Sequence, residues 1–211
     1  MRFPARQLIL SLTAILVAGC ASRPLPKYER PLARARVQSV RTTAYTHSES
    51  DHLKHGRSTA LGTRLRAEGV RSAAADWSRW PAGTVFRIQE TGETYQVDDY
   101  GWALAGTNTI DLYKPSRRQM NAWGVRRITI ENLEWGDADR SLAVLRPRRK
   151  HPHVRRMIDG LESRYAELKR PLDPPATTAA PVATRVASVA PPSNAAVAPL
   201  RPFNAPVGGY R

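Results

Sequence analysis

Two carboxylates separated by a glycine-rich stretch are the residues of this chain best suited to chemistry. Residues 99–113 read DYGWALAGTNTIDLY, with Asp99 at the start and Asp111 near the end. Proteins often cleave glycosidic bonds with two carboxyl groups that face one cleft, one of which donates a proton. The pair therefore indicates a site that cleaves sugar chains.

The residues on both sides of this stretch have the pattern of β-strands. Residues 95–98 alternate apolar and polar side chains, and residues 109–113 are rich in β-formers. We expect two neighbouring strands. Between them, Gly101, Gly106 and Asn108 should supply the positive φ angles of a sharp turn, which leaves the floor of the cleft free of bulky side chains.

Further motifs surround the pair in a fixed order: Thr43-Ala44-Tyr45, Ala75-Asp76 with Pro81-x-Gly83-Thr84, Asp99-x-Gly101, Asp111-Leu112-Tyr113 and Trp123-Gly124. On these motifs, residues 40–135 resemble the 3D domain, a family named for its three aspartates. The family is similar to the catalytic barrel of the A-type membrane-bound lytic transglycosylases. The resemblance implies a mainly β fold, a six-stranded double-psi β-barrel with short helices, over residues 37–136.

The resemblance also implies roles for the two carboxylates. Asp111 matches the catalytic aspartate, which protonates the oxygen between MurNAc and GlcNAc and then removes the proton of the MurNAc C6 hydroxyl. Burial would have to raise the pKa of Asp111 for the first step. Asp99 would raise that pKa by like-charge repulsion or stabilise the oxocarbenium-like transition state. The product would carry 1,6-anhydroMurNAc ends, and the reaction needs no metal or cofactor.

Five further residues are candidates for binding the substrate. Asp76 precedes a Pro-Gly loop and would brace the site, and Thr43 would hydrogen-bond the sugar unless it is simply a strand residue. Tyr45 and Gly101 belong to the matched motifs. Trp102 is the first candidate for stacking on a sugar ring.

One departure from the family lies at residues 99–103. The usual D-T-G-G-A is replaced by DYGWA, which puts two aromatic rings where small residues are expected. Trp77 and Trp80 are also candidates for stacking on the sugar, but packing in the core explains these two at least as well. Asp98 should face solvent, because strand alternation places it opposite Asp99.

The N-terminus has the features of a lipoprotein signal peptide over residues 1–20. Arg2 and Arg6 precede a short apolar run that ends in Val17-Ala18-Gly19-Cys20. The run is shorter than the roughly 18 residues of a spanning helix. Cys20 is the only cysteine, so it is expected to carry the lipid. Ala21 follows it, which implies a periplasm-facing protein of the outer membrane if the source is Gram-negative.

The formal net charge of +15 favours binding to anionic partners. In the cell envelope these are peptidoglycan and phospholipid head groups rather than nucleic acid. Loop histidines (His47, His52, His55) lie near Glu49 and Asp51, but their spacing matches no metal-ligand pattern, and we expect no metal site.

The remaining segments have simple patterns. Residues 21–36 suit a tether, residues 115–124 a helix capped by Ser116, and residues 125–135 a closing strand. The basic segment 146–170 should contain one amphipathic helix, and residues 171–211 a disordered tail rich in Pro and Ala.

Three functions remain open from the sequence. The leading one is a lytic transglycosylase, with a hydrolase that leaves reducing ends as its enzymatic alternative. The second is a non-catalytic peptidoglycan-binding lipoprotein, because double-psi barrels also serve as wall-binding domains and the A-type enzymes carry an additional domain for which this chain has no room. The third is an envelope scaffold in which basic residues around Arg148 and Arg155 contact lipid. The oligomeric state is not predicted.

Overall fold

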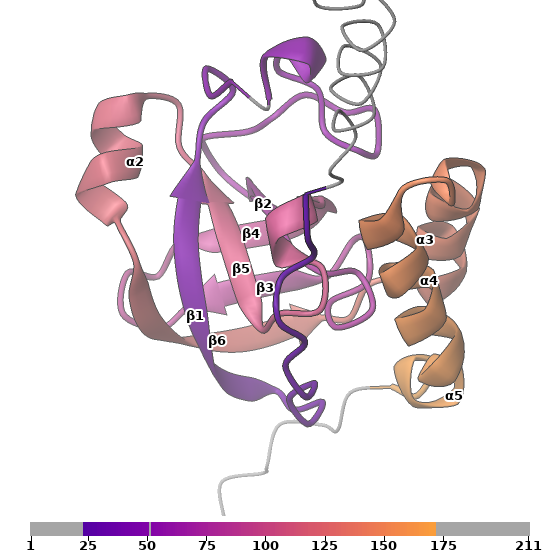
Figure 1. Cartoon of the computed structure of the whole chain (residues 1–211). Coiled ribbons are helices and arrows are strands. Elements are labelled where there is room, and N and C mark those ends of the chain that lie inside the picture. The colour runs from indigo at the N-terminus through magenta and orange to yellow at the C-terminus, as the bar shows by residue number, and fades with distance from the viewer. Residues whose placement is uncertain (1–22, 51, 172–211) are drawn as a thin grey trace, which may run out of the picture. The chain divides into compact units, whose positions relative to one another are not determined.

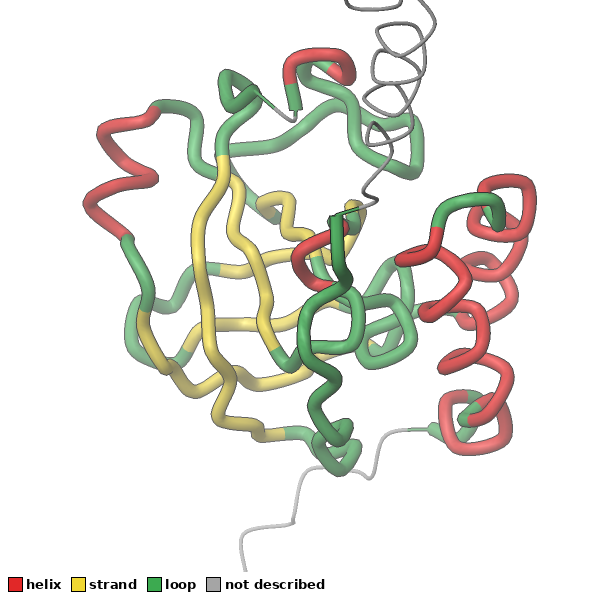
Figure 2. Tube along the Cα trace, viewed as in Figure 1, coloured by secondary structure: helices red, strands yellow, loops and turns green. Residues whose placement is uncertain are grey.

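The computed structural model describes residues 23–50 and 52–171, whose course is shown in Figures 1 and 2. The predicted signal peptide with Cys20 and the predicted tail beyond Pro171 lie outside the described residues.

The described chain is mainly a six-stranded β-sheet with a few short helices, as the sequence predicts. The strands are β1 (Val37–Tyr45), β2 (Arg71–Ala74), β3 (Val85–Ile88), β4 (Thr94–Asp99), β5 (Thr109–Tyr113) and β6 (Arg126–Glu134). Their order, β1-β5-β2-β4-β3-β6, closes on itself because β1 pairs with both β5 and β6. The pairs β1–β5 and β2–β4 are parallel and the others antiparallel.

The strands that carry the two candidate carboxylates are not neighbours, so that expectation is wrong. β2 lies between β4 and β5, parallel to the first and antiparallel to the second. The glycine-rich stretch is therefore a connection over another strand rather than a hairpin turn. Of the three residues expected to turn it, only Gly106 has a positive φ, 81°, whereas φ of Gly101 is −139°.

Alternation along the strands places one set of apolar side chains inside the closed sheet. This main core includes Val40, Ala73, Val97, Ile110 and Leu112, all fully buried. Since these residues alternate with the candidate site residues, the site lies on the other face of β1, β5 and β2.

The helical elements are short: η1 (Leu53–His55), η2 (Trp102–Leu104), α2 (Arg117–Trp123), α3 (Ala138–Leu145), η3 (Arg146–Arg148), α4 (Pro152–Ser163) and α5 (Tyr165–Leu168). The predicted cap of α2 is confirmed, because the Ser116 side chain accepts a hydrogen bond from the Gln119 amide and Gly124 follows the helix. None of the described helices is long and apolar enough to cross a membrane.

The C-terminal helices share the core of the sheet. The predicted amphipathic helix is present, but it breaks at Arg164 into α4 and α5, and α3 precedes it. Apolar residues from these helices continue the main core: Leu142, Leu145, Val154, Met157, Ile158, Leu161 and Leu168. In Figure 1 the three helices lie together on one side of the sheet, and α2 lies on the other.

Candidate active site

Four residues form a row across four strands of the sheet. Thr43 on β1 pairs with Asp111 on β5, Asp111 pairs with Ala74 on β2, and Ala74 pairs with Asp99 on β4. Directly paired residues present their side chains on the same face of a sheet. The backbones of Asp111 and Asp99 are two strand spacings apart, about 10 Å. In this row Ala74, whose side chain is a single methyl group, lies between the two aspartates.

Asp111 is the more accessible carboxylate of the row. Its side chain is partly exposed, and its Oδ1 accepts a hydrogen bond of 2.7 Å from the Thr43 hydroxyl. Thr43 is also partly exposed. The parallel register of β1 and β5 puts these two side chains side by side. Thr43 therefore orients the carboxylate and is more than a structural strand residue.

Asp99 is almost fully buried. Its Oδ1 accepts hydrogen bonds from the backbone N–H groups of Ala60, at 3.1 Å, and Tyr100, at 2.9 Å. The indole N–H of Trp77 donates to its backbone carbonyl. Burial raises the pKa of Asp99 to about 7; the charge of Asp98 adds to this, and the two backbone donors oppose it. Asp99 therefore changes charge near neutral pH.

Asp98 does not face solvent, so that expectation is wrong. It is 1% exposed, accepts a 2.7 Å hydrogen bond from the Ser72 hydroxyl and pairs with Arg66. The register of β2 against β4 shifts at this point, so that Ala74 pairs with Asp99 and Asp98 is skipped. A bulge breaks the strict alternation of sides, and both aspartates are consequently buried.

Asp76 is a structural brace that connects two loops. It is fully buried; Oδ1 accepts hydrogen bonds from the backbone and hydroxyl of Ser78, and Oδ2 accepts one from the Gly106 amide. Its second oxygen also lies 3.5 Å from Nε of Arg79, which is itself buried. These contacts bind the loop after β2 to the glycine-rich connection that leads from Asp99 to Asp111.

Apolar and aromatic side chains line the same face as the carboxylates. A second cluster, separate from the main core, consists of Tyr45, Leu65, Ala74, Leu104 and Tyr113. The Tyr45 and Tyr113 rings meet edge to face, with centroids 5.6 Å apart. Burial and the nearby charges of Asp99, Asp98 and Asp111 raise the pKa of Tyr45.

The Tyr45 hydroxyl lies in the field of both site carboxylates. Its proximity lowers the pKa of Asp99, yet it makes no hydrogen bond of ordinary geometry within the described part of the chain. It is thus a buried hydroxyl close to two carboxylates.

The tryptophans have different environments. Trp77 and Trp80 are fully buried in the main core, which excludes them as sugar platforms. Trp102 is partly exposed on η2, and the guanidinium of Arg23 lies 4.0 Å above its ring. Gly101 caps the first turn of η2, where an added Cβ would contact Leu104 at 3.5 Å.

Sequence reasoning missed the residues that cover the site. The loop between η1 and β2 packs Leu65 against the tyrosines, and its Arg57 and Arg64 oppose the burial that raises the pKa of Tyr113. From the C-terminal segment, Arg148 donates to the Tyr100 hydroxyl at 3.1 Å and to the Ala60 carbonyl at 3.3 Å. From the sequence, Arg148 is expected to contact lipid, and for the other residues the surplus of arginine in these segments is the only signal.

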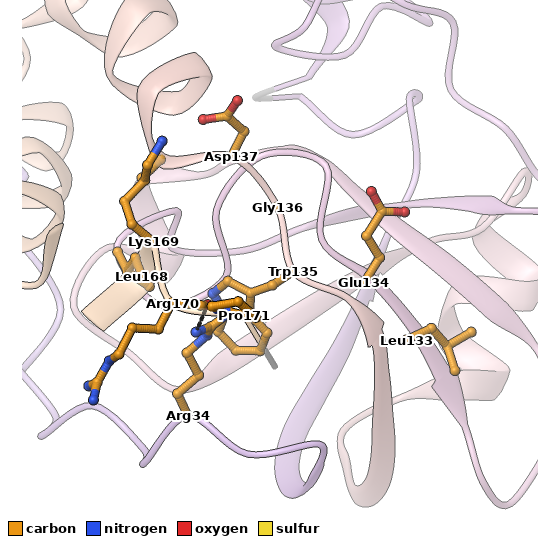
Figure 3. Close-up of a pocket in the computed structure, with 11 residues that line it drawn as sticks. Arg34, Leu133, Glu134, Trp135, Gly136, Asp137, Leu168, Lys169, Arg170 and Pro171 are labelled. Atoms are coloured by element: carbon orange, nitrogen blue, oxygen red, sulfur yellow. Dashed lines mark hydrogen bonds between the residues drawn. The ribbon is translucent and has the colours of Figure 1, made fainter. Parts of the chain in front are cut away.

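One hollow of the surface lies away from the carboxylates. It has a volume of about 430 Å³ and is formed by Arg34, the end of β6 and the residues after α5 (Figure 3). Arg34 there lies over the ring of Trp135. Among residues 23–50 and 52–171, no group of three His, Cys, Asp or Glu side chains is arranged to hold a metal ion.

Comparison of the chain with protein-family models and with curated proteins gives no match.

Proposed function

We propose that this protein is a peptidoglycan-cleaving lytic transglycosylase, which cuts the bond between MurNAc and GlcNAc and leaves 1,6-anhydroMurNAc ends. The observation that carries the proposal is the row in which Asp111 and Asp99 flank Ala74 on one face of the sheet. The order of the matched motifs supports it, and so does the closed strand order with two parallel pairs. We propose in addition that this closed sheet is a double-psi β-barrel.

Asp111 is the proposed general acid and then base. A general acid must reach the atom that it protonates, and Asp111 is the accessible carboxylate of the row. It gives its proton to the glycosidic oxygen as the bond to the anomeric carbon breaks. It then takes the proton of the C6 hydroxyl, whose oxygen attacks the anomeric carbon. The Thr43 hydroxyl holds the carboxylate in position during both transfers.

Asp99 is proposed to act through its charge. At about 10 Å and an effective dielectric constant of about 20, the negative charge of Asp99 stabilises a positive charge that develops beside Asp111 by about 1.7 kcal/mol. The same charge favours the protonated form of Asp111. Because the pKa of Asp99 is about 7, this contribution is lost as the pH falls below 7.

The proposed location is the cell envelope. Cys20 would carry the lipid anchor, in the outer membrane if the organism is Gram-negative, and the partner is the glycan strand rather than nucleic acid. Peptidoglycan also carries carboxylates, which complement the excess of basic residues.

The test is digestion of purified sacculi by the protein without residues 1–20, followed by mass spectrometry of the released muropeptides. The variants are Asp111→Asn and, as a matched control, Asp159→Asn on the exposed side of α4. We expect anhydro products from the wild type and the control, and none from Asp111→Asn.

Two other results would contradict the proposal, and each would identify a different function. Products with reducing ends, each heavier by one water, would identify a hydrolase. If the wild type and Asp111→Asn both bind sacculi and neither releases soluble material, the protein is a non-catalytic wall-binding module.

A further inference from the structure

The segment that precedes β1 has no helix or strand, yet the folded chain holds it at several points. The Glu29 amide donates to the Gly106 carbonyl at 2.8 Å, and the Glu29 carboxylate accepts from the Asn108 amide at 2.7 Å. The Asn108 side chain in turn donates to the Arg30 carbonyl at 2.8 Å. The middle of the segment is therefore bound to the connection between the two carboxylates.

The buried ion pair of Asp76 and Arg79 also binds the N-terminal segment. The guanidinium of Arg79 donates to the carbonyls of Glu29, at 2.6 Å, and Gly106, at 2.7 Å, and to the Asn108 side chain. Arg79 is 4% exposed and pairs with Asp76. A guanidinium with several partners in fixed directions holds them in one arrangement. The N-terminal segment is thus bonded to the same brace that positions the site loops.

The first described residues are held as well. Arg156 on α4 donates to the Pro26 carbonyl at 2.7 Å and to the Ala105 carbonyl at 3.2 Å. Leu25 lines a hollow on α4 together with Arg155. Arg23 ends over the ring of Trp102. In Figure 1 the indigo start of the described chain runs beside the short turn of η2.

The length of chain between this point and the proposed anchor is small. Arg23 follows Cys20 by three residues, which span at most about 10 Å when fully extended. A flexible linker of twenty residues would instead allow roughly 25 Å of root-mean-square separation and free rotation. Residues 23–36 behave as a strut, so little free chain remains between lipid and fold.

We propose that the strut holds the protein at the membrane in one orientation, with the surface around Arg23 and Trp102 against the phospholipid head groups. This proposal rests on the lipid anchor at Cys20 and not on the cleavage reaction. The carboxylate row, connected to η2 by Gly101, then lies close to the membrane surface. The enzyme would reach the part of the cell wall nearest to the lipid.

The chemistry of this surface fits a lipid head-group layer. Arg23, Lys27 and Arg155 are exposed there, and such cations near an anionic leaflet are attracted to it. A partly exposed tryptophan such as Trp102 is a side chain that gathers at the membrane interface. Exposed carboxylates in this region, among them Glu29 and Asp159, oppose the attraction, so the anchor and the cations together must set the orientation.

The experiment uses the full-length lipidated protein in vesicles of phosphatidylethanolamine and phosphatidylglycerol that contain head-group spin-labelled lipid. The thiol of Cys20 is occupied by the anchor, so a single introduced cysteine can be labelled with a small fluorophore. One variant is Ala103→Cys, exposed beside Trp102, and the matched variant is Asn121→Cys, exposed on α2. Quenching by the spin label reports closeness to the lipid.

We expect several-fold stronger quenching at position 103 than at position 121. Insertion of twenty Gly and Ser residues between Ser22 and Arg23 should bring the two values together, because it removes the constraint without altering the fold. Equal quenching at both positions in the uninserted protein would overturn the proposal. So would failure of the protein to float with vesicles, a result that leaves the cleavage proposal standing.

Discussion

The Asp99→Asn variant should gain unfolding free energy relative to the wild type as the pH rises. The carboxyl of Asp99 has a pKa of about 7 in the folded protein, against an ordinary value of 3.8. Asparagine keeps the oxygen that accepts hydrogen bonds from the Ala60 and Tyr100 amides. The substitution therefore removes the charge and leaves the local backbone contacts in place.

The sign and size of the effect follow from proton linkage. Between pH 3.8 and 7 the folded state binds more protons at Asp99 than the unfolded state does, so the wild type loses stability as the pH rises through this range. Each unit of pKa difference corresponds to about 1.4 kcal/mol, which gives about 4 kcal/mol in all. Asp99 is 7% exposed, so solvent screens little of this cost.

The assay is urea denaturation of the wild type and Asp99→Asn from pH 4 to pH 9. Asp159→Asn on the exposed side of α4 corrects for the loss of one negative charge. The difference in unfolding free energy between Asp99→Asn and the wild type should move by about 4 kcal/mol in favour of the variant, with most of the change complete by pH 7 to 8. A difference that stays constant with pH would refute the assignment of a raised pKa to Asp99.

Three further substitutions test the brace, the packing and the site. Asp76→Ala should cost about 3 to 5 kcal/mol of unfolding free energy, measured with urea, because it leaves the buried guanidinium of Arg79 without its carboxylate; a loss below 1 kcal/mol would contradict the brace. Gly136→Ala should cost roughly 1 to 3 kcal/mol or more by thermal unfolding, because its Cβ would overlap backbone atoms on the loop before β3; an unchanged midpoint would contradict this packing. Thr43→Val should lower the rate of muropeptide release about tenfold, since the hydroxyl that holds Asp111 is lost, while the unfolding free energy measured with urea should change by no more than about 1 kcal/mol. Thr43→Ser should restore the rate; equal rates for the two variants would show that the Thr43 hydroxyl takes no part in catalysis.

Part of the fold could be predicted from local patterns. The cap at Ser116, the stop at Gly124 and the strand over residues 126–134 depend on neighbours a few positions apart, and the structure has each of them. α3 was missed, although Asp137 caps it with hydrogen bonds to the next turn. A short helix with few periodic positions gives a weak signal.

The candidate site was predicted in its residues but not in its geometry. Asp99 and Asp111 were expected on paired strands, whereas β2 separates them and places Ala74 between. Asp98 was expected in solvent, and the bulge buries it. Strand order and bulges depend on pairing between residues far apart in the chain, which a single sequence does not specify.

Composition and local spacing establish which groups are available and which local elements form: the carboxylates, the alternating strands, the capped helix and the single cysteine near the N-terminus. Long-range packing, in contrast, buries Asp99, leaves Asp111 accessible and bonds the residues before β1 to Arg79. A carboxylate's pKa depends on the water and charges around it, so it follows from this packing and not from the neighbouring residues in the chain.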